Sequence, residues 1–212
     1  MFTCLVSLAR ASDWETWDGC RLVTTQFFDG DSFHVAKSGK DKIFRLYAVD
    51  TAETSEQIPE RVEEQAKYFS ATKDEVLAGG EQAEEFTRRV LQKPFMVETQ
   101  WVDAKGASHQ QRFYGKITSA DGSDLGLRLV EAGLARSHGM TQGLPPEYLR
   151  KLDRAESVAK AARRGIWGGK KAELPTDEGA EDVGPTPEPD TDIIDTQSVF
   201  DSLQQESAAG PE

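Results

Sequence analysis

The stretch Ile43-Phe-Arg-Leu-Tyr-Ala-Val-Asp-Thr-Ala-Glu53 sets one arginine and two carboxylates into a run of apolar residues. A continuous apolar run is typical of a buried strand. A charge inside such a strand needs a partner or a chemical task. Arg45 is therefore either half of a structural ion pair or a functional cation, and both readings stay open at this point.

Two further groups of polar residues flank this stretch. Asp29-Gly-Asp-Ser-Phe33 lies upstream and Tyr114-Gly-Lys116 lies downstream. The three segments supply the carboxylates of Asp31, Asp50 and Glu53 and the cations of Arg45 and Lys116. Two carboxylates can hold a hard cation, a third can orient or deprotonate a water, and cations can hold a phosphate. This order of groups suits metal-assisted attack on a phosphodiester.

The periodicity predicts an α+β fold. Short segments rich in Val, Ile, Thr and Phe, separated by Asp-Gly and similar turns, predict five strands over 20–28, 33–37, 43–49, 95–102 and 110–119. Helices are expected over 56–77 and 81–92, with a break at Gly79-Gly80, over 124–132 and from Pro146 to about 164. The pattern favours a small five-stranded OB-type β-barrel with about three packed helices.

Charge divides the chain into a body and a tail. The net charge is −12, but all 25 Lys and Arg lie in 1–172, together with 25 of the 37 Asp and Glu. The remaining 12 acids lie in 173–212, so the body is neutral and the tail should be disordered. We expect an N-terminal arm at 1–19, a folded domain at 20–170 with an extended helical insertion at 54–80, and an acidic tail at 171–212. The cations between 150 and 171 form either a solvated helix face or a handle for nucleic acid.

The cysteines and the N-terminal residues say little about fold or location. Cys4 and Cys20 do not make a disulfide framework, and no Cys/His cluster indicates structural zinc. The first eleven residues resemble part of a signal segment, or else form a frayed terminus, which slightly favours a secreted or periplasmic protein over a cytoplasmic one. No segment is apolar enough to span a membrane, and a monomer is the default expectation.

The order of six segments resembles the staphylococcal nuclease (thermonuclease-like) family. They cover about residues 20–168: Asp29-Gly-Asp-Ser-Phe33, Arg45-Leu-Tyr-Ala-Val-Asp-Thr-Ala-Glu53, Glu81-Gln-Ala-Glu-Glu-Phe-Thr87, Phe113-Tyr-Gly-Lys116, Leu129-Val-Glu-Ala-Gly-Leu-Ala135 and Gly165-Ile-Trp167. One such fragment is weak support, but six in family order are specific.

The resemblance implies an OB-fold nuclease that cleaves single- or double-stranded DNA and RNA with Ca²⁺ and leaves 3′-phosphate ends. By this resemblance, Asp31, Asp50 and the Thr51 carbonyl would hold Ca²⁺, and Glu53 would activate the water. Arg45 would grip the phosphate and Tyr114 would lie beside it.

Four departures from the family pattern bear on activity. Lys116 stands where the family has a second arginine, and lysine lacks the bidentate fork. Arg112 shares a strand face with Lys116 and is expected to assist substrate binding. Ala52 replaces a proline, and 137–141 replaces aromatic residues that stack beside the base. The long 54–80 insertion carries many acids. It forms either an acidic lid near the cleft, which would repel a polyanionic substrate or select short or single-stranded ones, or a solvated helix that faces away from the site, and we expect the second.

Two functions follow from these observations. One is an active metal-dependent nuclease, because the Asp31, Asp50, Glu53 and Arg45 set is intact. The other is a nucleic-acid-binding module that kept the fold and lost efficient chemistry, as in tandem nuclease-like domains of scaffold proteins. Lys116 favours the second function, and the retained carboxylates favour the first.

Overall fold

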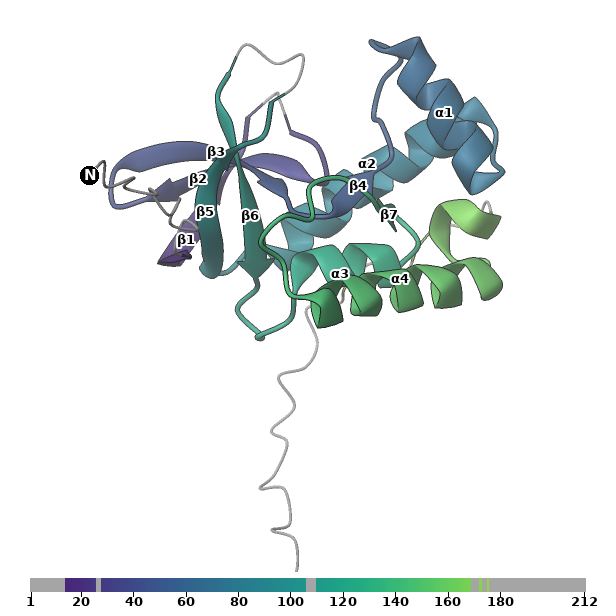
Figure 1. The fold of residues 1–212 in the computed structure, drawn as a ribbon. Helices are drawn as coiled ribbons and strands as arrows, with labels where there is room; N and C mark the ends of the chain where they lie inside the picture. Colours follow the sequence, from purple (N-terminus) through teal and green to yellow (C-terminus); the bar gives the residue numbers. More distant parts are fainter. Residues whose placement is uncertain (1–13, 26–27, 106–109, 169–171, 173–174, 176–212) are drawn as a thin grey trace, which may run out of the picture. The chain divides into compact units, whose positions relative to one another are not determined.

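Five strands pair in the order β1-β2-β3-β6-β5, and β5 returns to pair with β1, which closes the sheet (Figure 1). The structure is a computed structural model that describes residues 14–25, 28–105, 110–168, 172 and 175. The strands are β1 (Glu15–Val23), β2 (Ser32–Lys37), β3 (Lys40–Leu46), β5 (Phe95–Asp103) and β6 (Arg112–Thr118). β3 and β6 run parallel, and the other pairs run antiparallel.

Side chains alternate across the closed sheet as strand geometry requires. Phe33, Val35, Phe44, Val97 and Ile117 point inward and are fully or almost fully buried. The five-stranded sheet agrees with the predicted α+β class and is consistent with the OB-type arrangement. The predicted tail falls outside the described residues, and the domain boundaries stay a prediction.

The predicted strand over 43–49 is interrupted. β3 ends at Leu46, and Ala48 adopts a positive φ of 54°, which turns the chain. A short strand, β4 (Val49–Thr51), then pairs antiparallel with β7 (Ala135–Ser137) in a separate two-stranded sheet. This pairing sets Asp50 opposite Arg136, which is a contact that the sequence did not indicate.

In the described part of the chain, four α-helices pack beside the closed sheet, where the sequence predicted four helical segments and about three packed helices (Figure 1). They are α1 (Pro59–Phe69), α2 (Lys73–Val90), α3 (Leu125–Glu131) and α4 (Pro146–Ala161), and a 3₁₀ turn follows at Gly165–Gly168. None of the helices in the described part of the chain is long and apolar enough to cross a membrane.

The predicted helix break at Gly79-Gly80 is wrong, because α2 runs through both glycines. The break lies at Ser70–Thr72 instead. Ser70 ends α1 in the left-handed conformation, and Thr72 starts α2 with a capping box to Glu75. Local hydrogen bonds at the helix ends therefore set the boundary between α1 and α2, and the two glycines allow close packing of α2.

Gly80 brings α2 against the loop that carries Glu53. A Cβ built on Gly80 would lie 2.3 Å from the Glu53 carbonyl oxygen and 2.8 Å from that of Ala52. Alanine usually stabilises a helix by about 1 kcal/mol over glycine. Gly80→Ala should nevertheless lower the free energy of unfolding by about 1–3 kcal/mol, because backbone must move. Urea denaturation measures this, with the exposed Glu81→Ala as the control. An unchanged or higher midpoint would show that the loop accommodates a methyl group.

Two separate hydrophobic clusters hold the helices. The larger joins the interior of the closed sheet to α2, α3 and α4. The smaller lies under α1 and contains Ala52, Val62, Phe69, Val76 and Ile166. Helix α1 therefore rests mainly on α2 and the 3₁₀ turn.

Candidate active site

Asp31, Arg45 and Asp50 come together where β2, β3 and β4 meet. Arg45 pairs across the strands with Ser32, so its side chain lies next to Asp31. Its Nη2 lies 3.1 Å from Asp31 Oδ2 and 2.7 Å from Asp50 Oδ1. The structure thus assembles three of the predicted residues into one contact network.

Asp50 is the centre of this network. Its side chain is only 1% exposed. Oδ1 accepts from Arg45 and also from Arg61 at 2.9 Å, and Oδ2 accepts from Arg136 at 2.9 Å and from Gln65 at 3.4 Å. Burial raises the pKa of Asp50, but Arg61, Arg45 and Arg136 outweigh it, so the pKa lies below its ordinary value. Asp50 is therefore held as a carboxylate.

Asp31 has the opposite balance. It is buried, and burial raises its pKa to about 6, against the opposing effect of Arg45 and with a further increase from Asp50 and Asp29. The backbone N–H of Thr51 donates to Asp31 Oδ2 at 3.1 Å. The pKa values of these two buried carboxylates thus shift in opposite directions. Asp50 has three guanidinium neighbours, whereas Arg45 is the guanidinium among the main influences on Asp31.

Glu53 and Thr51 lie beside this pair. The Glu53 side chain is 25% exposed, and its Oε1 accepts from Arg61 Nε at 2.6 Å. The Glu53 backbone N–H donates to Gln65 Oε1 at 2.9 Å. The Thr51 carbonyl accepts from Gln65 Nε2 at 2.9 Å. One glutamine side chain thus fixes the loop that holds Glu53, which compensates for the alanine at position 52.

Helix α1 supplies residues that the sequence analysis missed. Arg61, Glu64 and Gln65 follow the spacing i, i+3, i+4 and so share one face of the helix. That face points to the site, which corrects the expectation that the insertion faces away. Glu60 and Glu63 on the same helix are exposed. The helical spacing of Arg61 and Gln65, soon after Glu53, was the pattern that could have revealed them.

Arg136 closes the network from β7. Its side chain is 2% exposed, and it forms a bidentate pair with Glu64, at 2.6 and 2.8 Å, beside its contact with Asp50. The guanidinium lies 4.8 Å from the centre of the Tyr68 ring. A buried arginine paired on two sides fixes α1 to β7.

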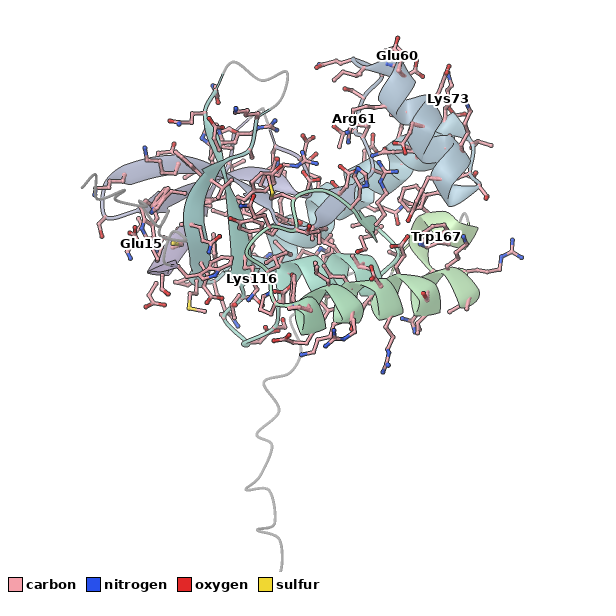
Figure 2. All side chains as sticks on the ribbon, in the orientation of Figure 1. Glu15, Glu60, Arg61, Lys73, Lys116 and Trp167 are labelled. Carbon is pink, nitrogen blue, oxygen red and sulfur yellow. The ribbon has the colours of Figure 1, made fainter. Side chains whose placement is uncertain are left out.

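The three predicted residues of β6 are placed differently. Tyr114 pairs in register with Arg45 and packs on Tyr47, with 5.1 Å between ring centres. Lys116 instead lies 3.3 Å from Glu98 and 5.2 Å from the Tyr148 ring centre. Figure 2 shows Lys116 low on the sheet and Arg61 beside α1. Tyr114 thus neighbours the site. In the described part of the chain, none of the contacts of Lys116 involves Asp31, Asp50 or Glu53.

Arg112 lies at the start of β6, opposite Ile43 in the register. Its Nε is buried and has no hydrogen-bond partner among the described residues. The structure does not join Arg112 to Lys116 or to the carboxylates, so its role in substrate binding stays a prediction.

The donor atoms were tested against the Ca²⁺ ion that the resemblance implies. Carboxylate and carbonyl oxygens are suitable ligands for this ion. Both oxygens of Asp50 and the Thr51 carbonyl already accept hydrogen bonds, however. No group of three or more His, Cys, Asp or Glu in the described residues is arranged to hold a metal. As arranged, the residues do not fit Ca²⁺, because the ion would have to displace guanidinium donors from both oxygens of Asp50 and Gln65 from the Thr51 carbonyl.

Comparison with known proteins agrees with the geometry. The family model for staphylococcal nuclease homologues matches residues 43–169. The chain is also similar to Staphylococcal nuclease domain-containing protein 1 of Drosophila melanogaster, with 38% identity over 97 residues. That match covers 45% of this chain and 10% of the relative, so the chain spans a small part of a longer protein. The family match extends from β3 through the 3₁₀ turn and includes Arg45, Asp50 and Glu53, and the chain belongs to the family of staphylococcal nuclease homologues.

Proposed function

We propose that this chain is a nuclease that hydrolyses phosphodiester bonds of DNA or RNA at the Asp31, Arg45, Asp50 and Glu53 site. The observation that carries the proposal is the contact of Arg45 with both Asp31 and Asp50, at 3.1 and 2.7 Å. Arg45 and Asp50 lie inside the segment that the family model matches. A partly exposed arginine held by two buried carboxylates is a preorganised contact for a phosphate.

Each role follows from the accessible atoms. The Arg45 side chain is 21% exposed, so a phosphate can reach its guanidinium while Nη2 stays with the carboxylates. Parallel hydrogen bonds from a guanidinium fix both the orientation and the charge of a phosphate. Glu53 engages Arg61 through Oε1, which leaves Oε2 to accept a proton from a water that attacks phosphorus.

A Ca²⁺ requirement belongs to this proposal as an expectation from the resemblance. The roles of Glu53 and Arg45 are assigned from their own contacts, and the metal is one arm of the experiment.

A nucleic-acid-binding module without hydrolysis is the second candidate. The observation that favours it is that the oxygens of Asp50 and the Thr51 carbonyl already accept hydrogen bonds from protein donors. In addition, the lysine at position 116 pairs with Glu98. Such a module would use Arg45 to hold a strand and would not cleave it.

The experiment is digestion of single-stranded DNA and of RNA by purified protein, with Ca²⁺, with Mg²⁺ and with chelator. An Arg45→Ala preparation, purified in the same way, controls for contaminating nuclease. Cleavage by the wild type that is lost in the variant, with 3′-phosphate ends, supports the nuclease. Binding without cleavage in all three arms supports the module, and neither binding nor cleavage refutes both.

A further inference from the structure

We infer that Arg61 is a second phosphate-binding residue of this site and takes the role that the sequence assigned to position 116. The inference rests on the proposed function, because it names a substrate contact at the same site. It concerns a residue of the α1 insertion (Pro59–Phe69), which the sequence analysis had placed away from the chemistry.

Lys116 is poorly placed for the role. It pairs with Glu98, which is its partner across β5 and β6, and it covers the ring of Tyr148. A lysine also lacks the fork that binds two phosphate oxygens. A substrate contact by Lys116 would require it to leave both partners.

Arg61 is well placed for it. Its Nη2 and that of Arg45 donate to the same oxygen, Asp50 Oδ1, at 2.9 and 2.7 Å, so the two guanidinium groups are direct neighbours. The side chain of Arg61 is 37% exposed, whereas that of Asp50 is 1% exposed, so Arg61 joins the buried aspartate to solvent. Nε and Nη2 make its hydrogen bonds, and Nη1 has no partner among the described residues.

Helix α1 holds this arginine in position. Four residues further along the helix, Gln65 binds the Thr51 carbonyl and the Glu53 backbone N–H, and Glu64 binds Arg136 through two hydrogen bonds. These contacts fix the face that carries Arg61, so little side-chain freedom remains to be lost when a phosphate binds. A merely structural arginine would not need a side chain that is 37% exposed, because Gln65 and Glu64 already anchor the helix.

Binding of a labelled single-stranded DNA with a phosphorothioate backbone, in chelator, tests the inference without cleavage. Arg61→Ala should weaken binding by about tenfold or more, the effect of one lost charge-assisted contact. The slope of log Kd against log salt should also fall by about 0.7, the value for one phosphate contact on a single strand. Arg61→Lys should recover part of the affinity.

Two other variants and a stability measurement complete the experiment. Lys116→Ala should weaken binding less than Arg61→Ala. Arg89→Ala removes an exposed cation paired with Glu85 on α2 and should match the wild type. Thermal unfolding of each variant separates lost binding from lost fold, and Arg61→Lys serves if Arg61→Ala does not fold.

Three results would overturn the inference. The first is unchanged affinity in Arg61→Ala, and the second is tighter binding in that variant, which would mean that the guanidinium obstructs the site. The third is a loss of affinity in Lys116→Ala that is larger than the loss in Arg61→Ala. If the wild type itself does not bind the strand, the proposed function fails and the inference fails with it. If the wild type binds and Arg61→Ala equals it, the inference alone fails.

Discussion

Glu53→Gln is expected to lower the rate of single-stranded DNA cleavage by about 10²–10⁴-fold, the contribution of a positioned general base. The amide keeps an oxygen that can accept from Arg61 Nε, so the loop geometry is preserved. It cannot take a proton from water at neutral pH. Because the Glu53 side chain is 25% exposed, the free energy of unfolding should change by less than about 1 kcal/mol.

Initial rates and urea denaturation of the same preparations measure both effects. Glu85→Gln is the matched control, since it makes the same change in an exposed pair with Arg89. A Glu53→Gln protein that cleaves at the wild-type rate would show that another group takes the proton. A protein that loses activity and stability together would show that Glu53 acts mainly through the Arg61 contact.

Asp50→Ala is expected to cost about 3–5 kcal/mol of folding free energy and to abolish activity. The physical reason is Arg136, whose side chain is 2% exposed and would keep Glu64 as its remaining carboxylate partner among the described residues. Removal of one member of a buried ion pair leaves a charge that water cannot reach. Arg45 and Arg61 would also lose the oxygen that they share.

Chemical denaturation quantifies this loss, with the exposed Asp41→Ala as the control. Asp50→Asn separates charge from shape, because the amide retains one acceptor oxygen but turns an N–H₂ toward guanidinium donors. A small stability change in Asp50→Ala would mean that Glu64 alone balances Arg136 and that the network is looser than its distances indicate.

The sequence predicted the elements whose patterns are local. β2, β5, β6, α3 and α4 lie near their expected positions, because alternation, turn residues and proline at a helix start are short-range features. The proximity of Asp31, Arg45 and Asp50 was expected from the family resemblance, which assigned all three to one site. The contact of Arg45 with Asp31 depends on the register of β2 and β3, which a hydrophobic pattern specifies well.

The remaining features depend on tertiary contacts. The turn at Ala48 is adopted against the usual preference of alanine, and β4 forms only because β7 lies beside it, far away in the sequence. The glycines in α2 looked like a break, but they mark a close backbone approach at Glu53. The inward face of α1 was missed because acids surround Arg61 along the helix, and the spacing of Arg61 and Gln65 was the one local pattern that pointed to it.

The separate cluster under α1 has a consequence for the order of unfolding. Elements that share few apolar contacts with the main core tend to open on their own, below the free energy of global unfolding. The backbone amides of α1 should therefore exchange their hydrogens faster than those of β2 or β6. Since α1 carries Arg61 and Gln65, heat should inactivate the protein at a temperature where the closed sheet is still intact.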